Sequence, residues 1–585
     1  MKRALFLTVS LGMTLLAQDQ PASGPAADPS GNDDAKHAVA RISLIQGVVN
    51  ARRGDSGEAT AAVVNAPLSA TDRLVTGEGS RSEIQFDAVN MIRLAPSTEV
   101  RIGELAYHHY QVQIANGTAT FRVMRDNDAE IEISTPAIAV RPLKKGIYRV
   151  TVKADGTSEV TVRQGEAEIA SPKGTEKLAA GKTMEARGTA SDPEFHVTGA
   201  LASDQWDAWN NNRDHDLERS GSGRYMNQDI NGGEELDNNG RWVDDPAYGQ
   251  VWVPNVDPDW APYQVGRWTW ADYYGWTWIS GDPWGWAPYH YGRWYRGAYG
   301  WAWWPGAIGG PCYWQPALVG FFGWGGFGVG FGFGNIGWVP LAPYERFYRG
   351  YGVGFGAGVV VRNVNVTNIY RNARVANGVT SMGAGEFGHA GVSRATSVRA
   401  SAADLSRAGS VRGGLPVAPS RESTRFSNAA AGAVHTTPGS SFYSRSGSTG
   451  AATHQSFEQQ RQAVARNASR VTPAAPSVGA ASAPRVSGPA TSTSQSTNSV
   501  STRSSTASAA AGQGQSQSWQ RFGGNNSGVS QGSAPTAGRP ASPVRINPSV
   551  VRSSGKGSSG SSSSGSRGAS APRSSGGSSH GGGRR

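Results

Sequence analysis

Short runs of alternating hydrophobic and polar residues fill the chain from about residue 39 to residue 190. Val160 and Val162 show this period of two, which is the period of a half-buried β-strand. Asn116-Gly117 and Asp155-Gly156 are dipeptides typical of tight hairpin turns. No window carries a sustained helical stripe. The pattern therefore predicts an all-β module of roughly ten or more strands, arranged as a β-sandwich or a short β-solenoid.

A second pattern, a repeat of aromatic residues, occupies residues 200–350. Eighteen of the 19 tryptophans fall between Trp206 and Trp338. The tripeptide Gly-Arg-Trp recurs every 26 residues, at 240–242, 266–268 and 292–294, and Trp-Ala-Pro-Tyr recurs at 260–263 and 286–289. In the same register, Trp252, Trp278 and Trp304 each lie ten residues after a Gly-Arg-Trp tryptophan. We expect repeated β units, too short to bury a core alone, whose rings pack against neighbouring units or bind a ligand.

The first 38 residues indicate export. Residues 1–17 combine Lys2 and Arg3, a mostly apolar run and a small residue, Ala17, which is the pattern of a secretory signal peptide. Residues 18–38 form a Pro/Ala/Asp linker. We therefore expect a periplasmic, cell-surface or secreted protein with no transmembrane segment in the mature chain.

The C-terminal third differs in composition and charge. Residues 391–585 hold 21 Lys and Arg against three acidic residues, which is +18, so residues 1–390 carry −7 of the total of +11. This Ser/Gly/Ala/Pro-rich segment cannot bury enough apolar surface to offset its chain entropy, and the sequence predicts a disordered basic tail. Residues 351–390 form a Gly/Asn/Val-rich extension with one or two further strands. Because we expect the protein to be exported, nucleic acid is not expected as the tail's partner.

No catalytic or metal-binding motif stands out. The sequence lacks His-Glu-x-x-His and paired Cys/His spacings, and Cys312 is its one cysteine. The acidic run at 229–240 places Gly233, Glu234 and Gly240 where an EF-hand needs a ligand, a glycine and a glutamate. Asp282 and Glu345 have no spacing that predicts a glycosidase pair. We expect a protein that is not an enzyme and that holds no cofactor and no metal.

Residues 39–190 resemble the extracytoplasmic domain of FecR-type proteins. The resemblance rests on ordered short motifs, which are Gly47-Val48, Asp72-Arg-Leu74-Val-Thr76-Gly77, Leu94-Ala-Pro-Ser-Thr98-Glu-Val100, Thr135-Pro136, Gly146-Ile-Tyr148-Arg-Val150 and Val160-Thr-Val162-Arg-Gln-Gly165. It implies a β-rich exported module, which in well-known members senses a transporter and controls a sigma factor. Those members carry a cytoplasmic segment and a transmembrane helix before the β domain. The predicted signal peptide stands in that place here, so we do not expect the sigma-factor role to carry over.

Residues 200–350 resemble a Trp/Tyr/Pro-rich domain of unknown function that often follows such modules. The most specific part is the string Gly285-Trp286-Ala-Pro-Tyr289-His290-Tyr291-Gly-Arg-Trp294. This resemblance implies an architecture and no chemistry.

The repeated aromatic residues suggest two alternatives. Exposed tryptophan and tyrosine rings stack on sugar faces, and neighbouring arginines pair with anionic glycans, which predicts binding of polysaccharide or peptidoglycan. The residues for this role are Trp260, Tyr263, Trp286, Tyr289, Arg241, Arg267 and Arg293. Alternatively the rings are the core, since each buried tryptophan contributes roughly 6 kcal/mol before entropy. For function we expect an adhesive or structural envelope protein; the alternative is a FecR-type sensor that acts through envelope proteins.

Overall fold

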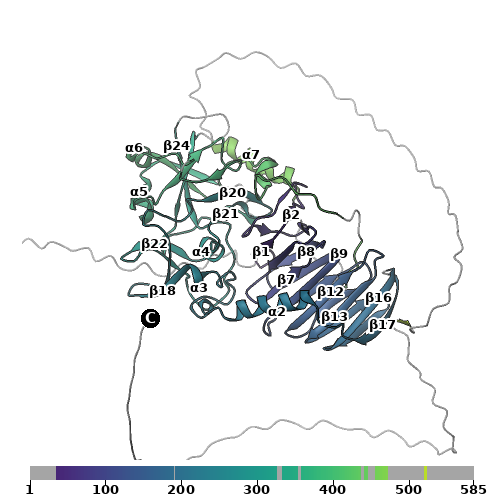
Figure 1. Cartoon of the computed structure of the whole chain (residues 1–585). Helices are drawn as coiled ribbons and strands as arrows, with labels where there is room; N and C mark the ends of the chain where they lie inside the picture. Colours follow the sequence, from purple (N-terminus) through teal and green to yellow (C-terminus); the bar gives the residue numbers. More distant parts are fainter. Residues whose placement is uncertain are drawn as a thin grey trace, which may run out of the picture. The chain divides into compact units, whose positions relative to one another are not determined.

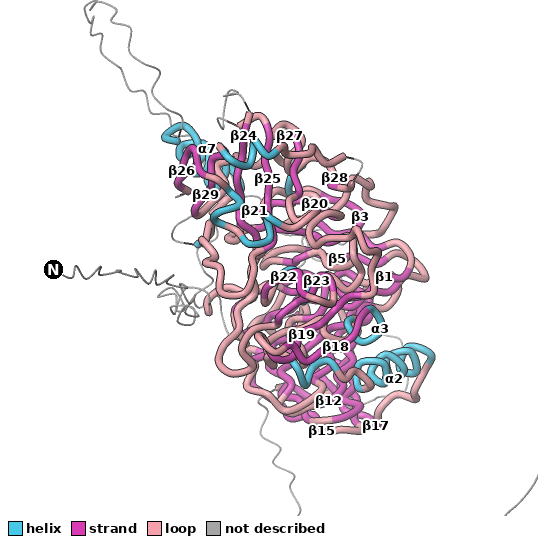
Figure 2. Tube along the Cα trace, turned by 90° about the vertical axis from the view of Figure 1, so that its left-hand side faces the viewer, coloured by secondary structure: helices cyan, strands magenta, loops and turns pink. Residues whose placement is uncertain are grey.

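The computed structural model describes residues 35–189, 191–325, 333–352, 358–394, 396–436, 441–445, 455–471 and 519–522. Strands dominate this part of the chain and helices are few (Figures 1 and 2), which confirms the all-β prediction. No helix in these ranges is both long and apolar enough to cross a membrane. The predicted signal peptide at 1–17 and the linker up to residue 34 lie outside the described residues.

The β module, residues 39–199, consists of seventeen strands. They are β1 (Ala40–Gln46), β2 (Val49–Arg52), β3 (Ala59–Ala61), β4 (Pro67–Leu68), β5 (Arg73–Thr76), β6 (Arg81–Gln85), β7 (Asn90–Leu94), β8 (Glu99–Ala106), β9 (His109–Val123), β10 (Glu130–Ser134), β11 (Ala139–Pro142), β12 (Gly146–Val152), β13 (Ser158–Gln164), β14 (Glu166–Ser171), β15 (Gly174–Ala179), β16 (Lys182–Thr189) and β17 (Asp192–Gly199).

Strand pairing in the β module follows two ladders. The first runs β1-β6-β7-β9-β12-β13-β16-β17, and the second runs β3-β2-β5-β8-β9-β10-β11-β14-β15. Strand β9 belongs to both, because its N-terminal half pairs with β8 and β10 and its C-terminal half pairs with β7 and β12. Aliphatic side chains from both ladders form one core, among them Ile42, Leu74, Ile92, Val112, Val150 and Ile169.

The two predicted hairpin turns have different outcomes. Asp155-Gly156 does connect a hairpin, since β12 and β13 pair from Val152 and Ser158 onward. The prediction at Asn116-Gly117 was wrong, because β9 continues through these residues. Gly117, at φ 90°, marks the point where β9 passes from one ladder to the other, and a Cβ there would lie 2.7 Å from the Ser97 carbonyl oxygen. The dipeptide therefore supports a bend within one strand and not a chain reversal.

The Trp-rich module, which we define as residues 200–436, begins with helix α2 (Gln205–Glu218), and three of its β-hairpins carry the Gly-Arg-Trp repeat. The hairpins are β18–β19 (Gly240–Asp245, Gly249–Pro254), β20–β21 (Gly266–Ala271, Gly275–Ser280) and β22–β23 (Arg293–Gly297, Gly300–Trp304). The remaining strands up to residue 412 are β24 (Val319–Trp324), β25 (Asn335–Pro340), β26 (Val359–Val364), β27 (Thr380–Gly383), β28 (Gly391–Val392) and β29 (Ala408–Arg412).

Short helices connect these strands. They are η1 (Ser222–Tyr225), α3 (Leu236–Asn239), α4 (Trp286–His290), α5 (Val366–Ile369), η3 (Arg371–Arg374), α6 (Ala402–Ser406) and η4 (Glu422–Thr424). The strands form sheets in the orders β18-β19-β23-β22, β21-β20-β28 and β26-β29-β24-β25-β27. Both β26 and β27 lie in the predicted 351–390 extension.

The Gly-Arg-Trp repeat has a steric basis in each hairpin. The glycine that precedes the arginine lies under a tryptophan ring of the second strand. A Cβ on Gly266 would lie 2.5 Å from Trp278, and a Cβ on Gly240 would lie 2.5 Å from Trp252. Glycine is therefore required for the ring to cover the backbone.

The third hairpin departs from the predicted 26-residue register. Trp242 pairs with Trp252 and Trp268 pairs with Trp278, but Trp294 pairs with Trp303 and not with Trp304. Two residues join β22 to β23, whereas three join the strands of the other two hairpins. A shift of one residue moves every side chain to the other face of a strand. Trp303 is consequently fully buried, and Trp304 is half-buried.

The folded structure extends beyond residue 391, where the sequence predicts a disordered tail. Strand β29 pairs with β24 and β26, and residues 420–432 contact the β module. Phe426 is buried in the core of the β module, although the surrounding composition is polar. The predicted boundary is therefore too early. Composition averages over a window and does not detect a few apolar residues that pack on an existing surface.

Three further segments of the predicted tail are described. Tyr443 donates its backbone N–H to the Thr135 carbonyl, helix α7 (Phe457–Val471) buries Phe457 and Val464 among the tryptophans, and β30 (Gln520–Arg521) pairs with β17. The rest of the predicted tail lies outside the described residues.

Candidate functional site

The four aromatic residues predicted to bind glycans are buried. Trp260 is 8% exposed, and Tyr263, Trp286 and Tyr289 are 0% exposed. The Tyr263 hydroxyl donates to the Tyr289 carbonyl at 2.6 Å, and Trp286 Nε1 donates to Asn231 Oδ1 at 2.6 Å. Covered ring faces cannot stack on a sugar, so the prediction of an exposed aromatic array was wrong. The alternative stated above holds for these rings, which are core.

The three predicted arginines do not form one site. Arg241 is exposed on β18. Arg267 is buried and donates to Asn428 Oδ1 at 3.0 Å, and burial, with a contribution from Arg425, lowers its pKa. Arg293 donates to the Gly292 carbonyl at 2.8 Å, and burial lowers its pKa as well. Arg267 therefore fastens the segment around residue 428 and does not present its charge to solvent.

Helix α2 attaches the Trp-rich module to the β module through charged residues. Its N-terminus is capped by Asp204, whose side chain accepts from the Asp207 N–H at 3.0 Å. Asp207 in turn binds Arg149 of β12 and Arg163 of β13. Trp206 Nε1 donates to the Thr120 hydroxyl at 2.9 Å. The helix consequently lies across the face of the first ladder (Figure 1).

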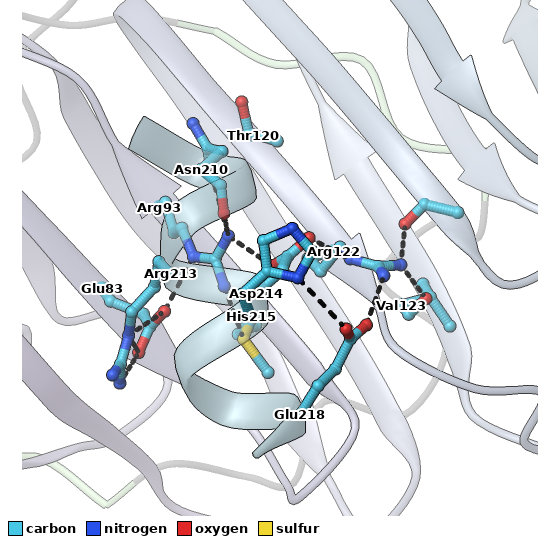
Figure 3. A network of polar contacts seen from close by, with 12 residues as sticks. Glu83, Arg93, Thr120, Arg122, Val123, Asn210, Arg213, Asp214, His215 and Glu218 are labelled. Atoms are coloured by element: carbon cyan, nitrogen blue, oxygen red, sulfur yellow. Dashed lines mark hydrogen bonds and ion pairs between the residues drawn. The ribbon is translucent and has the colours of Figure 1, made fainter. Parts of the chain in front are cut away.

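The centre of this contact is a buried ion-pair network (Figure 3). Arg93 of β7 is fully buried and lies 2.7 Å from Glu83 of β6 and 2.7 Å from Asp214 of α2. Arg122 of β9 lies 2.7 Å from the other oxygen of Asp214, and Arg213 lies 2.8 Å from Glu83. Burial alone would raise the pKa of Glu83, but the two arginines lower it to about 2. The carboxylate is therefore ionised and fixed.

A cavity of about 220 Å³ lies where the two modules meet. The β module contributes residues from the β6–β7 turn, the β8–β9 turn and the loop at 125–128, and the Trp-rich module contributes residues 228–229, Tyr274, Tyr291 and 312–314. Residues 37–39 complete the wall. The site is thus assembled from segments nearly 280 positions apart in the sequence.

Aromatic rings form most of the cavity wall. Tyr107 stacks on His108 at a ring-centroid distance of 4.0 Å and meets Tyr313 edge to face at 5.2 Å. Tyr110 stacks on Phe86 at 5.1 Å. Trp314 and Tyr274 meet edge to face at 4.8 Å on the opposite module, beside Tyr291. Such ring contacts fix the wall geometry from both modules.

Two aspartates are held in the wall by the tyrosine hydroxyls. Tyr110 donates to Asp87 Oδ2 at 2.8 Å, and Asp87 Oδ1 also accepts from the Val89 N–H at 2.6 Å. Tyr107 donates to Asp229 Oδ2 at 2.9 Å, and the Cys312 N–H donates to the same oxygen at 2.8 Å. These bonds orient the carboxylates and occupy the two hydroxyl donors.

The aspartates make the cavity electronegative. Burial, and then Asp229, raise the pKa of the Cys312 thiol to about 12. Burial, and then Asp87, raise the pKa of Tyr110 well above its usual value. Burial also raises the pKa of Tyr291, with contributions from both aspartates. All three groups are therefore neutral at physiological pH, which makes them weak nucleophiles.

The sequence gives only partial signals for this cavity. Asp229 begins the acidic run that resembles a calcium loop, and Cys312 is the single cysteine, but the tyrosines at 107, 110 and 313 stand in unrelated contexts. Among the residues that the structure describes, no group of three or more His, Cys, Asp or Glu side chains could hold a metal ion. A contact across the module boundary has no local sequence pattern.

Comparisons with known proteins confirm the two suspected domains. Residues 72–168 match the family described as FecR protein, and residues 233–345 match a family of unknown function, DUF6600. The chain therefore carries a FecR domain followed by a DUF6600 domain. Among curated proteins, none matches this chain.

Two solved structures are similar to part of this chain. Both are crystal structures of a candidate anti-sigma factor from Parabacteroides distasonis ATCC 8503, at 1.65 and 2.50 Å resolution. Each is 20% identical to this chain, with TM-scores of 0.21 and 0.20. The matches cover 23% and 22% of this chain, which spans 63% and 60% of those structures.

Proposed function

We propose that this protein is an envelope-associated sensor or regulator that acts through protein partners and catalyses no reaction. The observation that carries the proposal is the FecR domain at residues 72–168. Proteins with this domain are associated with the cell envelope, and the signal peptide predicted at residues 1–17 is consistent with the same location. This was the alternative in the sequence analysis.

The burial of the aromatic repeat weighs against glycan adhesion. Trp260, Tyr263, Trp286 and Tyr289 supply the core of the DUF6600 domain and leave no repeated ring surface for a polysaccharide. No other feature in the described residues replaces that surface. A protein partner therefore explains the architecture better than a cell-wall polymer does.

Polar contacts connect the β module to the Trp-rich module, as we expect for a sensor. Besides the network around Arg93, the buried Arg41 of β1 pairs with Glu235, and Asn65 donates to the carbonyls of Asp282 and Pro283. Polar contacts of this kind have defined geometry, so a displacement in one domain changes their distances in the other. Ligand binding where the two modules meet would thus alter polar contacts in both modules.

The experiment that tests the proposal compares transcripts between the host strain and a strain that lacks this protein. We expect a restricted set of genes to change and to be restored by the wild-type protein. Arg93→Met, which breaks the buried network, should fail to restore them, whereas Arg219→Met, which removes an exposed pair with Asp216, should succeed. Unchanged transcripts, together with salt-resistant retention of the purified protein on peptidoglycan or acidic exopolysaccharide, would support adhesion instead.

A further inference from the structure

We propose that the cavity between the two domains binds a small organic cation, with an ammonium or guanidinium group held among the aromatic faces and the aspartates. The proposal names the ligand of the sensor proposed above, and only its role as a signal rests on that function. Binding itself is a property of the purified chain and is tested independently.

The charge of the lining favours a cation. Four aspartates, Asp87, Asp126, Asp128 and Asp229, and a single arginine, Arg125, line the cavity, and Asp128 also contacts His108 Nδ1 at 2.8 Å. Asp126 and Asp128 lie on the exposed loop at the entrance, and Asp87 and Asp229 lie deeper, against the tyrosines. Carboxylates therefore attract a cation both at the entrance of the cavity and at its inner end.

The aromatic wall supplies the complementary surface. The π-face of a tyrosine or tryptophan attracts a cation that lies within about 6 Å of the ring centroid. Tyr107, Tyr313 and Trp314 come from both domains and surround the same space. Their tilted and edge-to-face contacts, at 5.2 Å for Tyr107 with Tyr313, keep the rings from collapsing onto one another.

A neutral sugar fits this lining less well. Sugar hydroxyls need both donors and acceptors around the ring, but Tyr107 and Tyr110 already direct their hydroxyl protons to Asp229 and Asp87. The remaining attraction comes from ring faces and carboxylate charge. The volume of about 220 Å³ is also below the roughly 300–1,000 Å³ usual for drug-sized ligands, which limits the occupant to a small molecule or one side chain.

The test is isothermal titration calorimetry on the full chain with choline and with its neutral isostere, 3,3-dimethylbutan-1-ol. The two molecules have the same shape and differ in charge. We expect choline to bind at least about tenfold more tightly, because a desolvated cation–π contact has no neutral equivalent. Equal affinity for the two compounds would overturn the proposal, since shape alone would then explain binding.

Matched variants assign the binding to this cavity. Tyr313→Leu should weaken choline binding about tenfold, whereas Tyr299→Leu, at an exposed tyrosine in the β22–β23 turn, should leave it unchanged. The double variant Asp126→Asn/Asp128→Asn alters only exposed side chains and should weaken binding a few-fold at low salt, with the difference lost at high salt. Unchanged affinity in both cavity variants, with native thermal unfolding, would overturn the site.

Two further probes distinguish the source of the cation. Ethanolamine represents a primary ammonium and agmatine a guanidinium group such as a partner's arginine side chain presents. Preference for choline indicates a free quaternary amine, and preference for agmatine indicates a basic side chain. If choline, ethanolamine and agmatine all fail to bind, the cation proposal is wrong, while the transcript experiment still decides whether the protein is a regulator.

Discussion

At the scale of single residues, charged side chains have two different roles in this molecule. Arg93, Asp214 and Glu83 are buried in a network where each partner offsets the desolvation of the others. Arg219 and Asp216 form a pair at the end of the same helix, but both are mostly exposed. Loss of an ion pair should therefore lower the free energy of unfolding strongly in the buried network and only slightly at the exposed pair.

Substitution of Arg93 tests this difference. Arg93→Met should lower the free energy of unfolding by about 3–5 kcal/mol, because it leaves Glu83 and Asp214 buried with fewer partners. Arg219→Met should change it by less than about 1 kcal/mol. Chemical denaturation of the two variants measures both values. A change in Arg93→Met as small as that in Arg219→Met would contradict the burial of the network.

At the scale of elements, the sequence predicts those that depend on local patterns. The alternating strands of the β module and two of the three Trp hairpins follow from periodicity and turn residues. Helix α2 was not predicted, because its buried positions include Asp207, Asn210 and Asp214 and it therefore lacks an apolar stripe. A helix that docks through ion pairs carries no hydrophobic period.

The third hairpin shows how a single position alters a prediction. The Tyr-Gly dipeptide of the turn stands at 248–249 and 274–275, which keeps the 26-residue spacing, but at 299–300 it comes one residue early. The shorter turn brings Trp303 opposite Trp294. The spacing of the turn residues thus predicts the changed register of the third hairpin. The spacing of the tryptophans, which stays at 26 residues, predicts an unchanged register.

The segment at residues 420–432 provides a test of the extended fold. Phe426 is 2% exposed and lies under the Arg53 guanidinium at 5.0 Å. Phe426→Ala should cost about 3–5 kcal/mol, as large aromatic truncations in a core do, and should make this segment sensitive to protease. Val398→Ala, at an exposed position, is the control. Limited proteolysis followed by mass spectrometry gives the cleavage sites. Cleavage near residue 391 in the wild-type protein would show that the folded part ends there, as the sequence predicts.

At the scale of the whole molecule, the cavity at the domain boundary could not be predicted, because its residues come together only after both domains fold and pack. The recurring tryptophans suggest a binding surface in the sequence, but in the structure most of them are buried in the core. The residues that line the cavity, such as Tyr107 and Tyr313, carry no repeat. Function at a boundary between domains leaves little trace in local sequence.

Protonation of His290 should lower the stability of the fold as the pH falls from 6.5 to 3. Burial lowers the pKa of His290 to about 3, although Nδ1 donates to the Gln315 carbonyl at 2.7 Å. Since the folded pKa lies below the unfolded value of 6.5, the unfolded chain binds more protons in this window and stability is lost as pH falls. The loss should be on the order of a few kcal/mol.

The control for this effect is His290→Asn, which keeps a donor near the position of Nδ1 and removes the titration. Thermal unfolding measured from pH 7 to pH 3 should show that the variant gains stability relative to the wild-type protein as the pH falls. Below pH 4.5 both proteins should lose further stability, because Glu83 has a folded pKa of about 2 and its ion pairs are lost as it is protonated. Identical pH profiles for the two proteins would show that His290 is not buried in its neutral form.

The aromatic repeat forms the core of the DUF6600 domain, and we therefore claim that it is not a glycan-binding surface. The most direct measurement is the free energy of unfolding of Tyr289→Ala, taken together with retention on peptidoglycan. Tyr289 is fully buried and donates its hydroxyl to Asp282. We predict a loss of about 3–5 kcal/mol with unchanged retention, and little effect of Tyr299→Ala. Native stability with retention abolished by Tyr289→Ala would contradict the claim.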